Sequence, residues 1–193
     1  MHETYFDHCS PGLVVLGVVV LIVVLLVKAF SGHGGIATKQ VDVGKYADTA
    51  ATATLLVDGP TNIDQAHQQV KITVSQTSNE IDIIQGYEGT VTQTRTYPNN
   101  SVAFGVFLQA LKLKNFAKGN DDKSLTDYRG YCPTGERYIY TFNDGQKDVF
   151  QYWSTSCNQG TFKGNALGVL ALFQQQIPQT DFNKLTNPIP LGF

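Results

Sequence analysis

The sequence predicts an α+β fold, in which an antiparallel sheet of about five or six strands carries two helices packed on one face. Three observations predict it. Short runs of alternating apolar and polar residues fill most of residues 52–97. Two later segments repeat apolar residues at helical spacing, and a hairpin pattern separates them. Four strands, a helix, two strands and a helix in this order are typical of an antiparallel α+β domain.

Four strands are expected before residue 98. In the second and third, apolar residues such as Ile72 and Ile81 alternate with polar ones such as Thr73 and Asp82, which is the pattern of half-buried strands. The expected strands are Thr52 to Val57, Val70 to Ser75, Glu80 to Ile83 and Thr90 to Tyr97.

Two helices are expected on the apolar face of this sheet. The first begins after a capping Asn100 or Ser101 and ends near Lys118 and Gly119. The second spans about Asn165 to Gln176, and Pro178 stops it, so that the final residues form an extended tail. The buried positions are expected to be Phe104, Phe107, Leu108 and Leu111 in the first helix, and Leu167, Leu170, Phe173 and Ile177 in the second.

A hairpin is expected between Cys132 and Cys157, closed by a type I′ turn at Asp144-Gly145, because Asp and Gly tolerate a positive φ. Counting outward pairs Asn143 with Gln146, Tyr140 with Val149, Ile139 with Phe150 and Cys132 with Cys157. The two cysteines then form a non-hydrogen-bonded pair with a Cα separation of about 4.5 Å, which suits a disulfide. Such a cross-link should stabilise the domain by roughly 3 kcal/mol.

The N-terminal region is expected to anchor the chain in a membrane. Residues 13–27 are apolar without interruption, and Lys28 can reach the headgroups, so residues 13–30 can cross a bilayer as one helix. A cleaved signal peptide is the alternative, but the preceding residues lack Lys and Arg. We therefore expect an anchor over 1–30, a flexible stalk over 31–51 and a domain over 52–193.

Two observations disagree about which side of the membrane holds the domain. Lys28, Lys39 and Lys45 follow the predicted span, and this charge bias favours a cytoplasmic domain. The expected pairing of Cys132 with Cys157 favours an extracytoplasmic one, because cytosolic thiols stay reduced. We give the cysteine pair more weight, since its register across a hairpin is an unlikely coincidence. Cys9 could be lipidated, cross-linked or free.

Composition and motifs exclude several functions. With 14 basic and 16 acidic residues the chain has no basic excess for nucleic acid. His67 is the only histidine after residue 33 and is expected on the surface, so the sequence predicts no metal site, no cofactor and no catalytic residue. Asp121, Asp122 and Asp127 lack the spacing of a calcium loop.

The hairpin aromatics are the candidate binding residues. Both hairpin faces are apolar, so one face is expected to cover the helices, and the other is either covered by another segment or exposed as a binding patch. The candidates are Tyr138, Tyr140, Phe142, Tyr152 and Trp153.

Several short segments of the chain together carry a resemblance to known proteins. They are Asp58-Gly59-Pro60, Ile72-Thr73-Val74, Gly86-Tyr87-Glu88-Gly89, Asn99-Asn100, Cys132-Pro133-Thr134-Gly135, Trp153-Ser154-Thr155-Ser156-Cys157, Gly160-Thr161-Phe162, Leu172-Phe173 and Gln176-Ile177-Pro178. With these segments the chain resembles a family of uncharacterised, membrane-anchored proteins of ultrasmall candidate-phylum bacteria. The resemblance covers about residues 50–178 and implies a bacterial, membrane-tethered, extracytoplasmic domain, with no catalytic residue.

The sequence thus favours a single-pass envelope or surface domain that binds a surface protein or cell-wall partner without catalysing a reaction. An envelope hydrolase acting on glycan or peptide through paired carboxylates is the first alternative. A pilus-like subunit is the second. The carboxylates available to a hydrolase are Glu80, Asp82, Glu88, Glu136 and Asp148.

Overall fold

The computed structural model describes residues 41–186. The predicted membrane span, residues 13–30, lies outside the described residues, as do residues 31–40 of the predicted stalk. Within residues 41–186 no helix is long and apolar enough to cross a membrane. The strands are β1 (Thr52–Asp58), β2 (Gln68–Ser75), β3 (Ser78–Gln85), β4 (Thr90–Pro98), β5 (Arg137–Asn143) and β6 (Asp148–Thr155). The helices are α2 (Ser101–Leu113), α3 (Ala166–Gln174) and α4 (Gln179–Thr186), with 3₁₀ turns η1 (Val43–Tyr46), η2 (Asp64–Ala66) and η3 (Lys123–Leu125).

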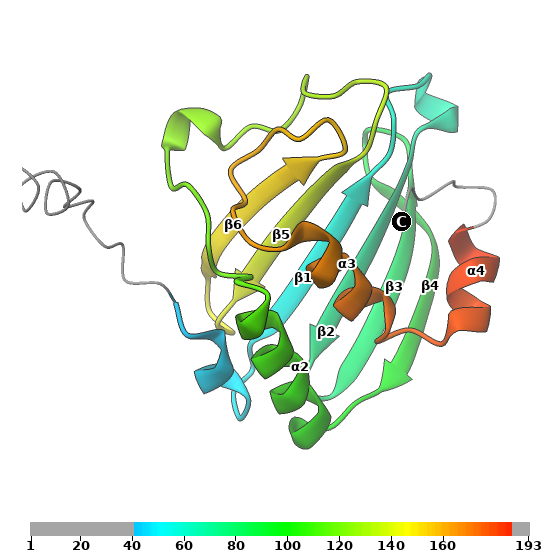
Figure 1. Ribbon diagram of the computed structural model, residues 1–193. Helices are drawn as coiled ribbons and strands as arrows, with labels where there is room; N and C mark the ends of the chain where they lie inside the picture. The colour runs from blue at the N-terminus through cyan, green and yellow to red at the C-terminus, as the bar shows by residue number, and fades with distance from the viewer. Residues whose placement is uncertain (1–40, 187–193) are drawn as a thin grey trace, which may run out of the picture. The chain divides into compact units, whose positions relative to one another are not determined.

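The six strands form one antiparallel sheet in the order β4-β3-β2-β1-β5-β6. Strands β1 to β4 follow one another as a meander, and α2 then returns the chain across the sheet so that β5 pairs with β1. Figure 1 shows α2 and α3 lying across the same face of the sheet. This confirms the expected α+β class, the antiparallel sheet and the two helices on one face.

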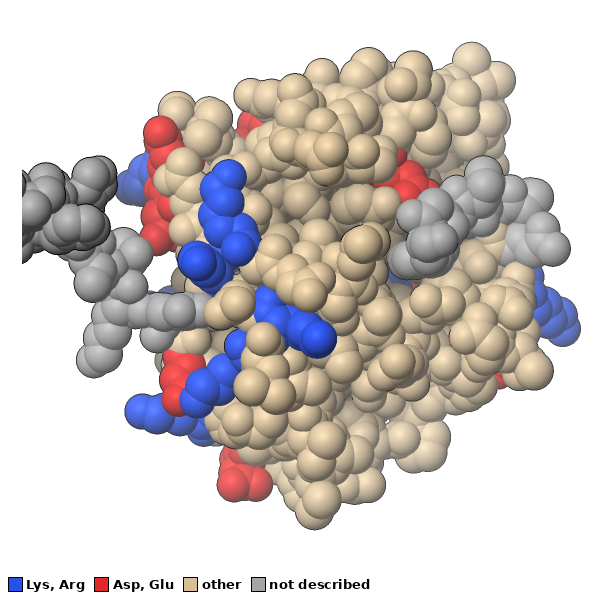
Figure 2. Space-filling view, viewed as in Figure 1, with Lys and Arg blue, Asp and Glu red and all other residues tan. Residues whose placement is uncertain are grey.

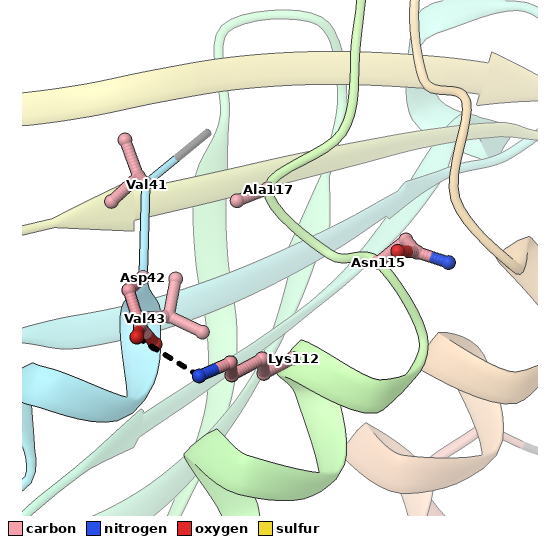
Figure 3. Close-up of a pocket in the computed structure, with 6 residues that line it drawn as sticks. All are labelled: Val41, Asp42, Val43, Lys112, Asn115 and Ala117. Atoms are coloured by element: carbon pink, nitrogen blue, oxygen red, sulfur yellow. Dashed lines mark hydrogen bonds and ion pairs between the residues drawn. The ribbon is translucent and has the colours of Figure 1, made fainter. Parts of the chain in front are cut away.

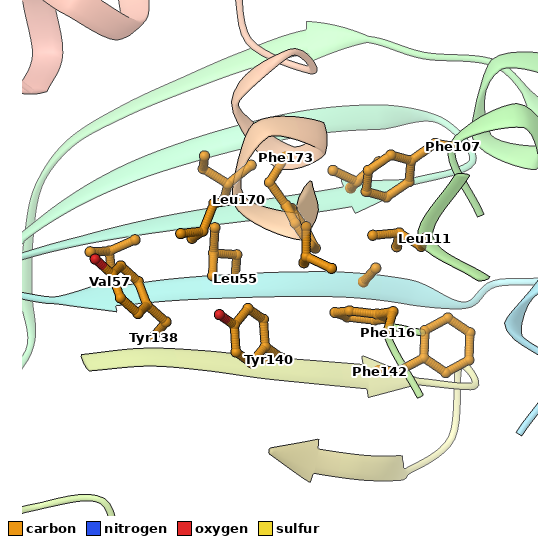
Figure 4. Close-up of a cluster of buried hydrophobic side chains, with 14 of the residues drawn as sticks. Leu55, Val57, Phe107, Leu111, Phe116, Tyr138, Tyr140, Phe142, Leu170 and Phe173 are labelled. Atoms are coloured by element: carbon orange, nitrogen blue, oxygen red, sulfur yellow. The ribbon is translucent and has the colours of Figure 1, made fainter. Parts of the chain in front are cut away.

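The core lies between this face and the two helices. Residues at alternate positions of β1, such as Leu55 and Val57, point toward α2 and α3 because neighbouring strand residues face opposite sides of a sheet. Figure 4 shows Tyr140 and Phe142 of β5 completing the same layer against Phe173 of α3. The hydrophobic core is therefore continuous from the meander to the hairpin.

The hairpin register differs from the prediction by three residues. Tyr140 faces Tyr152 and not Val149, and a bulge follows Phe142. Gly145 has a positive φ of 99°, whereas Asp144 does not, so the turn is not type I′.

The loop is longer than predicted because the Asp144 side chain forms a local turn. Its Oδ1 accepts hydrogen bonds from the backbone N–H groups of Gln146 and Lys147, at 2.9 and 3.0 Å. A shift by an odd number changes which residues share a face. Trp153 consequently lies beside Ile139 on the face away from the helices, which we call the outer face.

Helix α2 begins where expected, with Asn100 as its N-cap, but ends five residues early. The Asn100 side chain accepts a hydrogen bond from Ala103 N at 2.9 Å. The helix ends at Leu113 because Asn115 has a φ of 57°, the left-handed conformation common just after a helix. The prediction that it continues to Lys118 is wrong.

Helix α3 and the residues after it also correct the sequence prediction. Val169, not Leu167, joins the buried residues of α3, and Leu167 is 72% exposed. Helix α3 ends at Gln174, before Pro178. Pro178 then begins α4, since its carbonyl accepts a hydrogen bond from Phe182 N at 2.9 Å. Tyr97 of β4 donates to Asp181 of α4 at 2.8 Å, so residues 179–186 are not an extended tail.

Residues 41–51 pack on the domain and do not form part of a flexible stalk. Val43 and Ala51 are fully buried, and η1 packs against α2. Lys112 of α2 forms a salt bridge with Asp42 at 2.9 Å. The packed part of the described chain therefore includes residues 41–51, which precede the predicted boundary at residue 52.

The core tyrosines predict that the fold loses stability in alkali. Tyr138, Tyr140 and Tyr152 have raised pKa values, mainly because they are buried. The pKa of Tyr140 is raised to about 12. Tyrosines in the unfolded chain ionise near pH 10, so above that pH the unfolded state binds fewer protons than the folded state. The free energy of unfolding therefore falls as the pH rises further.

We expect the thermal unfolding midpoint to fall progressively as the pH rises from about 10 toward 12. Because lysines titrate in the same range, Tyr140→Phe provides the comparison, and its midpoint should fall less steeply than that of the wild type. Equal slopes for the two proteins would contradict the assignment of this effect to Tyr140.

Candidate functional site

The predicted disulfide is present, although the predicted register is not its cause. The Sγ atoms of Cys132 and Cys157 are bonded, and their Cα atoms are 5.8 Å apart. Both cysteines lie beyond the strand pairing, which starts at Arg137 and Thr155. Cys132 occupies a turn with a φ of 47°. The bond closes the loop that precedes β5 onto the turn that follows β6.

All five candidate binding aromatics are buried, at most 7% exposed. Tyr138, Tyr140, Phe142 and Tyr152 belong to the core beneath the helices. Trp153 lies on the outer face, where its Nε1 donates to Leu125 O at 2.6 Å and its ring contacts Tyr131. The structure therefore offers none of the five as an exposed binding surface, and Leu125 and Tyr131 cover the outer face at Trp153.

A buried polar cluster joins three neighbouring strand ends. Asp58 ends β1, and it lies opposite Arg137 of β5 and Gln69 of β2. Its carboxylate accepts from Arg137 Nε at 2.8 Å and from Gln69 Nε2 at 3.1 Å, and it lies 2.8 Å from His67 Nε2. Asp58, Arg137 and His67 are all at most 5% exposed.

His67 is fully buried, so the prediction of a surface histidine is wrong. Its Nδ1 lies 3.2 Å from Pro60 O, its Nε2 contacts Asp58, and its ring stacks on Tyr87 at 4.1 Å. Both ring nitrogens therefore have polar partners, and Gln69 Nε2 also lies 3.4 Å from Nε2. No Ser, Thr or Cys side chain is among the partners described for His67, so this arrangement supplies no nucleophile to activate.

The same cluster holds the loop between β1 and β2. Arg137 donates to Gly59 O and to Thr61 Oγ1, the latter at 3.2 Å. Tyr87 donates to Asn62 O at 2.8 Å. Arg137, His67 and Tyr87 therefore fix the backbone of this loop, which is a structural role.

The carboxylates of the hydrolase alternative also have structural partners. Asp82 forms a salt bridge with Lys71 at 2.9 Å, and Glu136 accepts a hydrogen bond from Tyr138. Glu80 accepts from Thr96, and Asp148 from Asn143. Glu88 lies exposed in the turn before β4.

The acidic loop likewise shows no cation site. Asp121 accepts a hydrogen bond from Tyr152, Asp122 caps η3 and Asp127 pairs with Arg129. Across residues 41–186 no group of three or more His, Cys, Asp or Glu side chains is placed to hold a metal ion.

Away from Trp153 the outer face of the sheet is mostly polar. This is what an antiparallel sheet with helices on one side requires, and so it does not define a site. One row of cross-strand neighbours consists of Thr96, Glu80, Thr73, Thr54, Thr141 and Gln151.

The solvent side of α2 carries aliphatic residues that the folded core does not require. Val102, Val106 and Leu113 are 76%, 67% and 82% exposed. With Gly105, Gln109, Ala110 and Ala47 they line an open groove of about 570 Å³, which we call the α2 surface. Exposed aliphatic side chains gathered on one helix face are characteristic of an interaction site.

A second cavity adjoins the C-terminal end of α2. It has a volume of about 300 Å³, and Val41, Asp42, Val43, Lys112, Asn115 and Ala117 line it. Figure 3 shows Lys112 reaching across it to Asp42. Neither this cavity nor the groove contains two carboxyl groups, as a glycosidase would require.

The comparisons with known proteins identify no family. No family model matches the chain, and a search of curated proteins found no match.

We expect two Asp–Arg pairs with the same separation to contribute very differently to the stability of the fold, because one is buried and the other is exposed. Asp58→Ala leaves Arg137 and His67 buried without their carboxylate, and should lower the free energy of unfolding by about 3–5 kcal/mol. Asp127 and Arg129 are also 2.8 Å apart, but their side chains are 55% and 80% exposed. Asp127→Ala should therefore leave the urea midpoint unchanged.

Both variants can be measured by urea unfolding followed by circular dichroism. If Asp58→Ala does not fold, Asp58→Asn keeps hydrogen-bonding atoms but removes the charge, and should be destabilised measurably. Equal midpoints for Asp58→Asn and Asp127→Ala would contradict a structural role of the buried charge.

Proposed function

We propose that this chain is a single-pass, membrane-anchored binding domain on the extracytoplasmic side of a bacterial membrane, without catalytic activity. The α2 surface carries the binding role, because its aliphatic side chains remain exposed while the aromatic residues of the hairpin are buried. The partner surface is therefore the α2 surface, not the hairpin predicted from the sequence.

The disulfide supports the extracytoplasmic placement. Bonds of this kind form and persist in oxidising compartments. Cys157 lies in an exposed turn, where a reducing cytosol would reach it. The uninterrupted apolar run at residues 13–27 supports the anchor.

The lack of catalytic activity is supported by the partners of the polar residues. His67, the domain's histidine, contacts a carboxylate and a backbone carbonyl and no nucleophile described in residues 41–186. Of the candidate carboxylates, Glu80, Asp82 and Asp148 bind residues of neighbouring strands and Glu136 binds Tyr138. The described residues that line the two cavities at α2 do not include two carboxylates in either cavity.

The placement can be tested by thiol labelling of intact cells with a membrane-impermeant maleimide. A Cys9→Ser background removes the third cysteine. In this background we expect no labelling of Cys132 and Cys157 until an external reductant is added. The matched Cys9→Ser, Cys132→Ser variant leaves the exposed Cys157 unpaired, and it should be labelled without reduction.

Labelling of both proteins only after cell lysis would overturn the proposal and place the domain in the cytoplasm, as the charge bias favours. Labelling of the Cys9→Ser protein without reductant would show that the disulfide does not form in the cell.

A further inference from the structure

The α2 surface continues onto the start of α3. Exposed aliphatic residues recur along α2 at positions 102, 106 and 113, and Leu167 of α3 is 72% exposed. Backbone contacts bring the two helices together here, since Asn165 N donates to Lys114 O at 2.9 Å. The chain therefore presents an aliphatic strip across two helices on one side of the molecule.

Lysines surround the C-terminal end of this strip. Lys112 and Lys114 lie at the end of α2, and Lys163 N donates to Lys118 O, which places the loop before α3 beside the loop after α2. Lys45 belongs to η1, which packs on α2. Figure 2 shows basic side chains gathered on this face, with acidic side chains beside some of them.

The lysines beside the α2 surface favour a negatively charged partner. Within residues 41–186, only Lys112 of the five lysines forms a salt bridge, with Asp42. The first turn of α2 contains no acidic residue. Two copies that met through α2 would bring these lysines together, and among the described residues only Asp42 forms a salt bridge with one of them, which disfavours self-association.

The position of the chain entry indicates which partner lies within reach. The described domain begins at Val41, and Val41 lines the cavity that Lys112 also lines. Ten residues, 31–40, connect it to the end of the predicted membrane span at Phe30. An extended segment of this length reaches at most about 35 Å. A domain tethered so closely meets the lipid surface at very high local concentration.

We infer that the α2 surface docks on the anionic lipid surface of the membrane that anchors the chain. Val102, Val106 and Leu113 insert among the headgroups, and the lysines contact lipid phosphates, as in helices that lie in a membrane interface. This inference rests on the proposed membrane anchor. The polar outer face of the sheet then points away from the membrane.

The test uses the full chain in lipid nanodiscs with an environment-sensitive fluorophore on a single introduced cysteine. Two Cys9→Ser proteins are compared, one with Val106→Cys on the α2 surface and one with Thr94→Cys, an exposed residue of β4 whose side chain lies on the outer face. Lipids that carry a nitroxide near the headgroup quench a fluorophore that contacts them.

In nanodiscs with about one-quarter phosphatidylglycerol we expect severalfold stronger quenching at position 106 than at position 94. High salt or phosphatidylcholine alone should reduce the difference, since both weaken the attraction of lysines to the surface. Adding Val102→Asp and Leu113→Asp should abolish the difference. These residues are exposed, and so the unfolding midpoint should not change.

The outcomes separate this inference from the proposed function. A chain that co-elutes with nanodiscs but shows equal quenching at positions 106 and 94 is anchored without docking, which overturns the inference alone. A chain that does not co-elute with nanodiscs contradicts the anchor. Cross-linking between two copies through position 106, without lipid quenching, would assign the α2 surface to a second copy and overturn lipid docking.

Discussion

The Asp58 carboxylate lies where β1, β2 and β5 meet, and the arrangement of the sheet depends on it. A buried carboxylate is costly unless it is paired, so the registers that place Arg137 and Gln69 opposite Asp58 are strongly preferred over neighbouring ones. This pairing fixes where β5 joins the meander, although β5 follows β1 by about 80 residues. The crossover through α2 then places the first helix over the core.

The hairpin extends the sheet from this point and divides its aromatic residues between two faces. Tyr138, Tyr140 and Tyr152 face the helices, and their hydroxyl groups find partners at the margin of the core, such as Ser154 and Asp121. Trp153 faces the other way, beneath Leu125 and Tyr131. The disulfide joins the end of that covering loop to the turn after β6, and so it secures the loop as well as the hairpin.

Function follows from what this arrangement leaves exposed. The face of the sheet that a one-sided antiparallel domain turns to water is polar, whereas the solvent side of α2 is aliphatic and bordered by lysines. Those aliphatic residues contribute nothing to the core, because Phe104, Phe107, Leu108 and Leu111 already bury the opposite side of the helix. The proposed role in contacting a partner would account for them, and the proposed anchor would bring a membrane within reach.

The sequence by itself determined the class of the fold and placed the first four strands and α3 to within two residues at each end, because alternation, helix spacing and capping are local properties. It identified the disulfide as well, although the register from which the bond was predicted is not the observed one. It also showed the aliphatic residues of α2 but not their exposure. The register of the hairpin, the burial of its aromatics and the role of His67 were decided only by the tertiary structure. A three-residue change in a turn reverses the face of Trp153, and the partners of His67 include Asp58, nine residues away, which no local pattern relates to it.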